Sequence, residues 1–226
     1  MTMHCGMVAR KITLSKIKHI DLLLISVDSP ILLGIYENKK LVKSLSKDGK
    51  FSDSLPNLFG TILAECFANK EQIANSSIAD EFLGLCEVCN DDKTNRLSRK
   101  RTEALPKKSL RDEFNIYYVN GPGNFSAIKL THIFLQTLQI SLNALFMRES
   151  STAQSNKVRL FCADAFHFSD SEFINAYGKI HFVKENGEIR TTTLESKRTN
   201  SFTLPKTLDT SIFSDKCAPL YILPAV

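Results

Sequence analysis

The sequence lacks the short motifs that mark the most common catalytic sites. It contains no Walker-type GxxxxGK loop and no GxGxxG loop for nucleotide phosphates, no GxSxG serine elbow and no HExxH pair for zinc. The five histidines show no paired spacing that is typical of a metal site. No catalytic constellation can be assembled from these residues, which favours a binding role over an enzymatic one.

Long hydrophobic runs and disulfide-type cysteine patterns are also missing. The apolar run at 22–27 ends at Asp28 and is too short for a membrane span or a signal-peptide core. The six cysteines lie mostly in apolar stretches, and the CxxC formed by Cys86 and Cys89 has no second pair to complete a zinc site. We therefore expect a cytoplasmic protein, away from the membrane, with structural cysteines and no bound metal.

The composition is that of a globular protein with a core. Of 226 residues, 43% are hydrophobic and 23% are charged, so the chain has enough apolar side chains to fold. The net charge of +5 permits a nucleic acid nearby without requiring one.

Apolar periodicity predicts an α/β protein. Three apolar runs at 22–27, 31–36 and 41–45, separated by turn residues, predict an antiparallel meander whose first strand is central. A single apolar face predicts a helix over 53–67, capped by Ser52, Asp53 or Ser54, with Pro56 in its first turn. Further strands are expected at 114–119 and 158–163, and a hairpin is expected at 179–184 and 188–193.

The longest predicted helix, 125–146, is apolar around most of its circumference. Its polar residues form one narrow ridge: Lys129, His132, Gln136, Gln139 and Asn143. Such a helix has to be covered on more than one side. A sheet covers one side, and a second helix from this chain or from a partner covers another.

Three polar features each leave two interpretations open. The turn Gly121-Pro122-Gly123-Asn124, between a strand and a helix, suits either an anion site or a tight turn that needs glycine. Asp28 and Ser29 either hold a metal-bound phosphate or simply satisfy a turn, and we favour the turn. The basic arm 93–111 is either a solvated loop or a phosphate-contacting segment; the absence of interleaved aromatic residues favours the loop.

An ordered set of motifs resembles the TsaB (YeaZ-like) family. Ser109-Leu110-Arg111-Asp112, the strand 114–119 and Gly121-Pro122-Gly123-Asn124-Phe125 are similar to that family's S-L-x-D lead, apolar strand and GPGSFTGxR turn. Asp28-Ser29-Pro30 stands where the family has D-T-S, and the segment 218–223 is similar to its closing E-P-x-Y-x-R. The chain departs from the family at Asn124, Ser126, Ala127 and Lys129, where the family has Ser, Thr, Gly and Arg.

The resemblance implies an actin-like (ASKHA, ribonuclease H-like) fold with two lobes of mixed sheets flanked by helices. On this basis we expect an N-terminal extension at 1–20, a first lobe at 21–150 that carries an insertion at 69–108, and a smaller second lobe at 151–226.

The resemblance also implies a function. TsaB is the non-catalytic partner of TsaD, the metal-bearing transferase that makes threonylcarbamoyladenosine in tRNAs reading ANN codons, and the ATPase TsaE joins the pair. The chain is then expected to contact tRNA only indirectly and to hold no cofactor of its own, with ATP or ADP and Mg²⁺ binding only in the complex. Whether it forms a homodimer when alone is left open.

In the family the first two helices form the docking surface, here 53–67 and 125–146. The expected contact residues are Leu55, Phe59, Ile62, Lys129, His132, Phe134 and Leu138, although the apolar ones suit the core equally well. Two alternatives remain: an enzyme of the actin superfamily that uses Asp28 and the 121–124 turn on ATP, and a tRNA-binding module that uses the basic arm.

Overall fold

The predicted meander begins the larger of two sheets. The computed structural model describes residues 19–67, 113–149, 158–196 and 199–222. Strands β1 (His19–Ile25), β2 (Ile31–Glu37) and β3 (Lys40–Lys47) pair antiparallel in sequence order. β4 (Glu113–Val119) lies parallel to β1 on its other side. β1 is therefore central, as predicted, and its unbroken apolar run is explained by burial on both faces.

A fifth strand completes this sheet. β5 (Val158–Ala163) pairs parallel with β4, which gives the strand order β3-β2-β1-β4-β5. The sequence places this strand in a second lobe starting at 151, but in the structure it belongs to the first sheet. The cause is the long helix before it, because a parallel neighbour requires a crossover connection of this kind.

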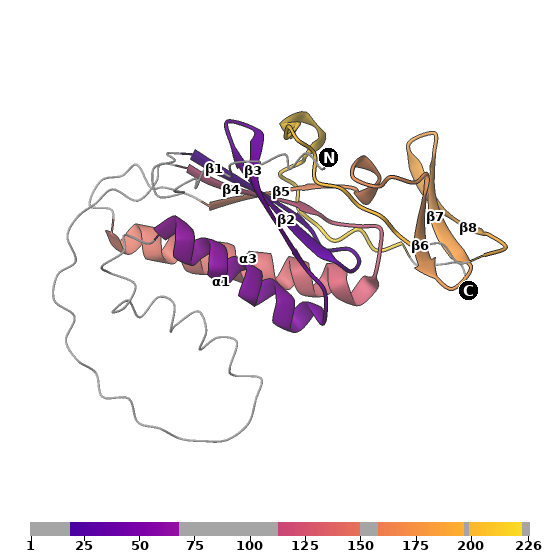
Figure 1. Cartoon of the computed structure of the whole chain (residues 1–226), viewed down its shortest axis with the longest axis horizontal. Helices are drawn as coiled ribbons and strands as arrows, with labels where there is room; N and C mark the ends of the chain where they lie inside the picture. The colour runs from indigo at the N-terminus through magenta and orange to yellow at the C-terminus, as the bar shows by residue number, and fades with distance from the viewer. Residues whose placement is uncertain (1–18, 68–112, 150–157, 197–198, 223–226) are drawn as a thin grey trace, which may run out of the picture.

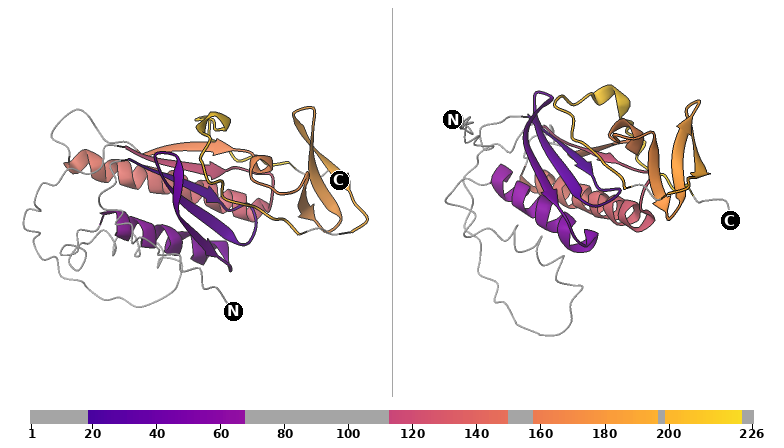
Figure 2. Two further views of the ribbon diagram at one scale, coloured as in Figure 1. Left: turned by 45° about the horizontal axis from the view of Figure 1, so that its top comes forward. Right: turned by 45° about the vertical axis from the view of Figure 1, so that its right-hand side comes forward.

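Two helices cover one face of the sheet. α1 (Phe51–Phe67) and α3 (Phe125–Glu149) lie side by side on the same face of the sheet (Figures 1 and 2). α1 begins earlier than predicted, because the amides of Asp53 and Ser54 both donate to the Lys50 carbonyl. Ser52, Asp53 and Ser54 thus lie inside the first turn instead of capping it, and Pro56 falls in the second turn.

Alternate residues of β1 pack into two separate apolar cores. Leu22 and Leu24 face the helices and join a core with the buried sides of α1 and α3. Leu23 and Ile25 point to the opposite face and pack with residues from the C-terminal part of the chain, including Phe168. This is the period-two alternation of a strand, with both of its faces covered.

The C-terminal residues form a smaller antiparallel sheet. After the 3-10 turn η3 (Ala165–His167), strands β6 (Phe173–Tyr177), β7 (Ile180–Glu185) and β8 (Glu188–Thr193) pair in the order β6-β7-β8. The predicted hairpin is confirmed, with Asn186 and Gly187 at positive φ in its turn. β6 is not predicted by the sequence pattern. A second 3-10 turn, η4 (Thr210–Ile212), follows.

The chain then returns to the larger sheet. The Tyr36 hydroxyl donates to the Pro205 carbonyl at 2.8 Å, and Lys40 forms a bridge with Thr207. The α/β class is therefore confirmed. Within the described residues, no helix has both the length and the apolar character needed to cross a membrane.

Candidate functional site

The glycine turn after β4 is pressed against the end of β1. A Cβ atom at Gly123 would lie 2.6 Å from the Val27 carbonyl oxygen, and the Asn124 amide donates to that same oxygen at 2.8 Å. Gly121 adopts a φ of +127°, and a Cβ there would meet the Leu220 carbonyl at 2.7 Å. Both glycines are explained by close backbone contact, which only glycine permits.

The same turn starts α3. The Asn124 side-chain oxygen accepts a hydrogen bond from the Ala127 amide at 3.1 Å, the arrangement of a helix N-cap. One turn further, the hydroxyls of Thr131 and Ser26 are hydrogen-bonded at 2.8 Å in the buried interior. The start of α3 is thus tied to the end of β1, and the Asn124 and Ala127 amides are already used within the chain.

Asp28 and Ser29 lie at this same end of β1, as the sequence predicts. The Asp28 carboxylate accepts hydrogen bonds from the Ser29 amide and from the side chain of Asn200, which in turn accepts from the Asn175 amide. Sequence reasoning missed Asn200, since it is 172 residues from Asp28 and no local pattern marks it. The carboxylate links β1 to the C-terminal part of the chain.

The predicted contact residues divide into a buried and an accessible group. The Leu55, Phe59, Ile62 and Leu138 side chains are at most 2% exposed and belong to the core on the helical side of the sheet. Phe134 is half-buried and meets the Phe59 ring edge-on, at 5.3 Å between centroids. The core interpretation therefore holds for these four side chains, which are closed to a partner, whereas Lys129 is exposed.

The polar ridge of α3 turns toward β4 and β5. His132 Nδ1 lies 3.0 Å from the Tyr118 hydroxyl. Asn143 accepts from the Val158 amide at 2.8 Å, while Gln139 donates to the Val158 carbonyl at 3.0 Å. The ridge thus closes one end of β5. These contacts explain His132, Gln139 and Asn143, three of the five polar residues on the ridge.

Burial affects the protonation of both members of the pair formed by Tyr118 on β4 and His132 on the ridge. It raises the pKa of the Tyr118 hydroxyl, and it lowers the pKa of His132. Both shifts favour the neutral forms. The hydrogen bond between Tyr118 and His132 therefore joins two uncharged groups.

Two cysteines lie near β4 and β5: Cys162 is part of β5, and Cys217 packs against the same core. The Cys162 thiol donates to the Lys216 carbonyl and the Cys217 thiol to the Ser214 carbonyl, each at 3.7 Å. Hydrogen bonding with Cys217 lowers the pKa of the Cys162 thiol to about 7, although burial opposes this shift. The same hydrogen bond raises the pKa of Cys217. Neither thiol is part of a disulfide.

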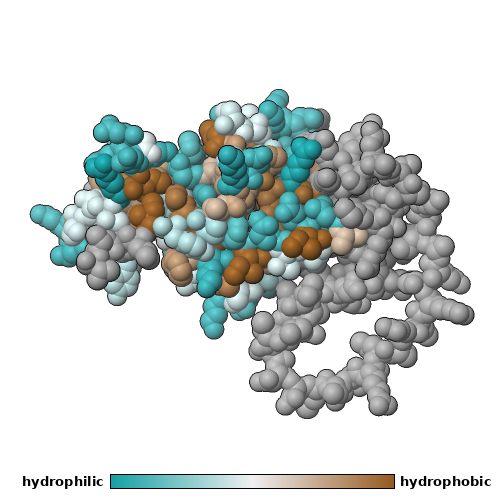
Figure 3. Space-filling model, turned by 180° about the vertical axis from the view of Figure 1, so that it is seen from behind, coloured by the Kyte–Doolittle hydropathy of each residue, from teal (hydrophilic) through white to brown (hydrophobic). Residues whose placement is uncertain are grey.

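The side of α3 that faces away from the sheet carries exposed apolar residues. Leu130, Ile133 and Ile140 are 43%, 52% and 69% exposed, and we call these three residues the outer stripe. Seen from behind, brown patches lie among hydrophilic side chains over the lower half of the molecule, where α3 runs (Figure 3). The helical pattern predicts an excess of apolar surface, but it does not identify these three residues.

Some sequence predictions fall on residues that the structure does not describe. These are the N-terminal extension up to residue 18, the insertion 69–108, the basic arm 93–111 and the Cys86–Cys89 pair. Across the described ranges, no three His, Cys, Asp or Glu side chains gather as metal ligands would.

No model of a known protein family matches the chain, and no curated protein matches it either.

Proposed function

We propose that this chain is a non-catalytic scaffold that docks onto a partner protein through the outer face of its helical layer. The outer stripe of α3 carries the proposal. Ile140 is 69% exposed although its side chain is among the most apolar, and Ile133 lies two helical turns before it. Large apolar side chains clustered on one exposed face are typical of an interaction surface.

The neighbouring side chains suit close packing by another helix. The outward residues between and beyond the stripe are small, namely Ser126, Thr137 and Ala144 on α3. On α1, Thr61 is exposed and Gly60 has nothing within 4 Å of its Cβ position. Large apolar residues flanked by small ones allow a second helix to approach with good surface complementarity.

The contacts around the glycine turn support a scaffold over an ATP-using enzyme. Gly123 and Asn124 are held against Val27, and Asn200 and the Ser29 amide both donate to the Asp28 carboxylate. A phosphate or a phosphate-bound metal at this place would have to compete with these intramolecular hydrogen bonds. The turn is therefore assigned a structural role.

The resemblance to the TsaB family suggests the identity of the partner. The order β3-β2-β1-β4-β5, with β2 antiparallel, followed by a second small sheet, supports a two-lobed actin-like fold. The partner proposed is a TsaD homologue, joined by a TsaE homologue, in the threonylcarbamoyladenosine modification of ANN-decoding tRNAs in the cytoplasm. ATP or ADP with Mg²⁺ would bind only in that complex.

The test is co-expression of this chain with the TsaD homologue of the same organism, followed by affinity pull-down and size-exclusion chromatography. Ile133→Asp and Ile140→Asp should each weaken the heterodimer at least roughly tenfold, because a charge would be buried at an apolar contact. Tyr177→Asp is the matched control: it places the same charge on an exposed aromatic residue of β6, 81% exposed, away from α3.

Charges at Phe59 or Leu138 are unsuitable for this purpose, because both side chains are in the core and the variants would unfold. Separate elution of the two wild-type proteins at micromolar concentration, with the TsaE homologue and ATP present, would reject this partner. Equal binding by the stripe variants and Tyr177→Asp would reject the docking face. Light scattering of the chain alone reports whether it forms a homodimer.

A further inference from the structure

β5 is the last strand of the larger sheet, and one of its edges faces away from β4. The Asn120 amide donates to the Ala163 carbonyl, so Ala163 points its backbone groups toward β4. Cys162 points the other way, because its amide and carbonyl both bond to Ser214 at 2.8 Å. Backbone groups alternate in direction along a strand. Val158, Leu160 and Cys162 therefore direct their backbone groups outward.

Only the middle one of these three outward positions is open. Asn143 and Gln139 satisfy the Val158 amide and carbonyl, and Ser214 satisfies both groups of Cys162. Within the described ranges the backbone amide and carbonyl of Leu160 have no outward partner, although Leu160 is only 6% exposed. A backbone pair at a strand edge is a template for one more residue of an extended chain.

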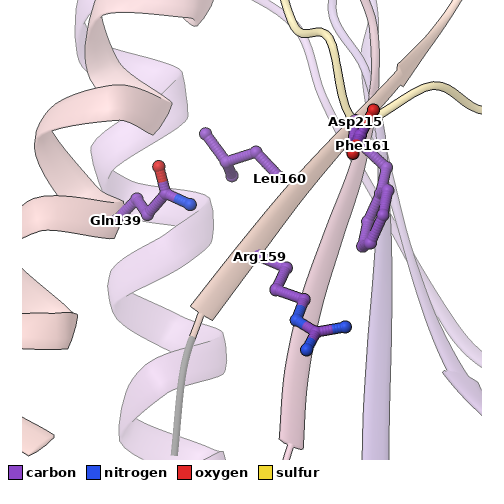
Figure 4. Close-up of a pocket in the computed structure, with 5 residues that line it drawn as sticks. All are labelled: Gln139, Arg159, Leu160, Phe161 and Asp215. Atoms are coloured by element: carbon purple, nitrogen blue, oxygen red, sulfur yellow. The ribbon is translucent and has the colours of Figure 1, made fainter.

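A cavity lies at this position. It has a volume of about 290 Å³ and is lined by Gln139, Arg159, Leu160, Phe161 and Asp215. Figure 4 shows Gln139 and Leu160 on the helical side of β5, with Arg159 and Phe161 on the other side. The cavity thus lies along the edge of β5 beside an open backbone pair, and Leu160 and Phe161 are its apolar lining residues.

The rim of the cavity carries two charges of opposite sign. The side chains of Arg159 and Asp215 are both exposed, and neither forms an ion pair with another described residue. An extended ligand with an acidic side chain near Arg159 and a basic one near Asp215 would complement both. Four residue steps separate Val158 from Cys162, about 13 Å of strand, which accommodates about three residues of a ligand.

We propose that this cavity binds an extended segment of a partner protein. One residue of the segment bonds its backbone to the Leu160 amide and carbonyl, and an acidic side chain next to it faces Arg159. This is strand addition at a sheet edge, in which backbone hydrogen bonds provide affinity and flanking side chains provide selectivity. The site is on the opposite flank of α3 from α1 and does not depend on the outer stripe.

The test uses backbone NMR of the full chain and a synthetic peptide, acetylated and amidated, of sequence TKVET. Paired antiparallel to β5 with its valine opposite Leu160, this peptide places its glutamate beside Arg159 and its lysine toward Asp215. The β-branched residues favour an extended conformation, and the Glu and Lys match the two rim charges. In the free chain, the Leu160 amide should exchange with solvent faster than the Phe161 amide, which faces β4. Peptide addition should shift and protect the Leu160 amide.

Four controls make the result specific. N-methylation of the central valine removes the backbone donor and should abolish the shift. Arg159→Glu should weaken TKVET roughly fivefold, the limit for an exposed ion pair, and should favour the peptide TKVKT instead. Arg190→Glu makes the same charge change on β8 and should leave binding unaltered, as should Ile133→Asp.

Two outcomes would overturn the proposal directly. Equal protection of the Leu160 and Phe161 amides in the free chain would mean that the edge is already closed. Equal binding of the N-methylated peptide would mean that no strand is added. Protection of Leu160 that grows with protein concentration, without peptide, would instead assign the edge to a second copy of this chain. A failure of the chain to bind the TsaD homologue would leave the amide-exchange and peptide-binding measurements unaffected.

Discussion

Replacing Gly123 by alanine separates a packing role of the glycine turn from a ligand role. The added Cβ would sit 2.6 Å from the Val27 carbonyl oxygen and 2.7 Å from the Val27 Cβ, whereas ordinary contacts begin at 3.4 Å. The backbone at one of the two sites must therefore move. Overpacking of this kind costs about 1–3 kcal/mol. The hydrogen bond from Asn124 to Val27 would weaken as well, which adds about 1 kcal/mol.

The expected loss in free energy of unfolding is thus about 2–4 kcal/mol, or roughly 5–15 °C in Tm for a chain of this size. Urea and thermal unfolding followed by circular dichroism, without any ligand present, measure it. Gly60→Ala is the matched control: its Cβ meets nothing within 4 Å and lies within α1, so it should stabilise by about 0.5–1 kcal/mol. A Gly123→Ala variant as stable as wild type would refute the packing explanation.

The remaining predictions concern the ridge of α3 and the cysteine beside it. Asn143→Ala removes the partner of the buried Val158 amide and should cost about 1–3 kcal/mol in urea unfolding, while Gln136→Ala should cost little. Burial lowers the pKa of His132 from 6.5, so the unfolded chain binds this proton more readily; the free energy of unfolding should fall as the pH drops below 6.5. His132→Gln should abolish that fall, and a slope unchanged in the variant would exclude His132 as its source. The ultraviolet absorbance of a thiolate should rise near pH 7 in the wild type and not in Cys162→Ser.

The outer stripe and the β5 edge address different kinds of contact. The stripe is a convex, apolar helix face, which is suited to another helix. The edge offers one backbone pair between two charges, which is suited to an extended chain. α3 links the two, because it presents Ile133 and Ile140 outward while Gln139 and Asn143 close one end of β5. Stripe variants and edge variants should therefore impair separate interactions.

Local patterns in the sequence were sufficient for most of the described elements and for the turn, with β6 as an exception. The unbroken apolar run of β1 indicated a central strand, the Asn-Gly pair at 186–187 indicated a hairpin, and the glycines at 121 and 123 indicated a tight start to a helix. Each of these depends on the periodicity of one segment or on the φ angles of one or two residues. The beginning of α1 was predicted less well, since three polar residues in a row could each serve as its cap.

Only the tertiary structure decided which side chains are accessible and which polar groups meet. Phe59 and Ile133 are both apolar residues of the helical layer, yet one is fully buried and the other half exposed. The pairing of Asn200 with Asp28 and of Asn143 with Val158 likewise joins different elements. Periodicity defines the faces of a helix, but the packing of the sheet and the neighbouring helix determines which face remains open to solvent.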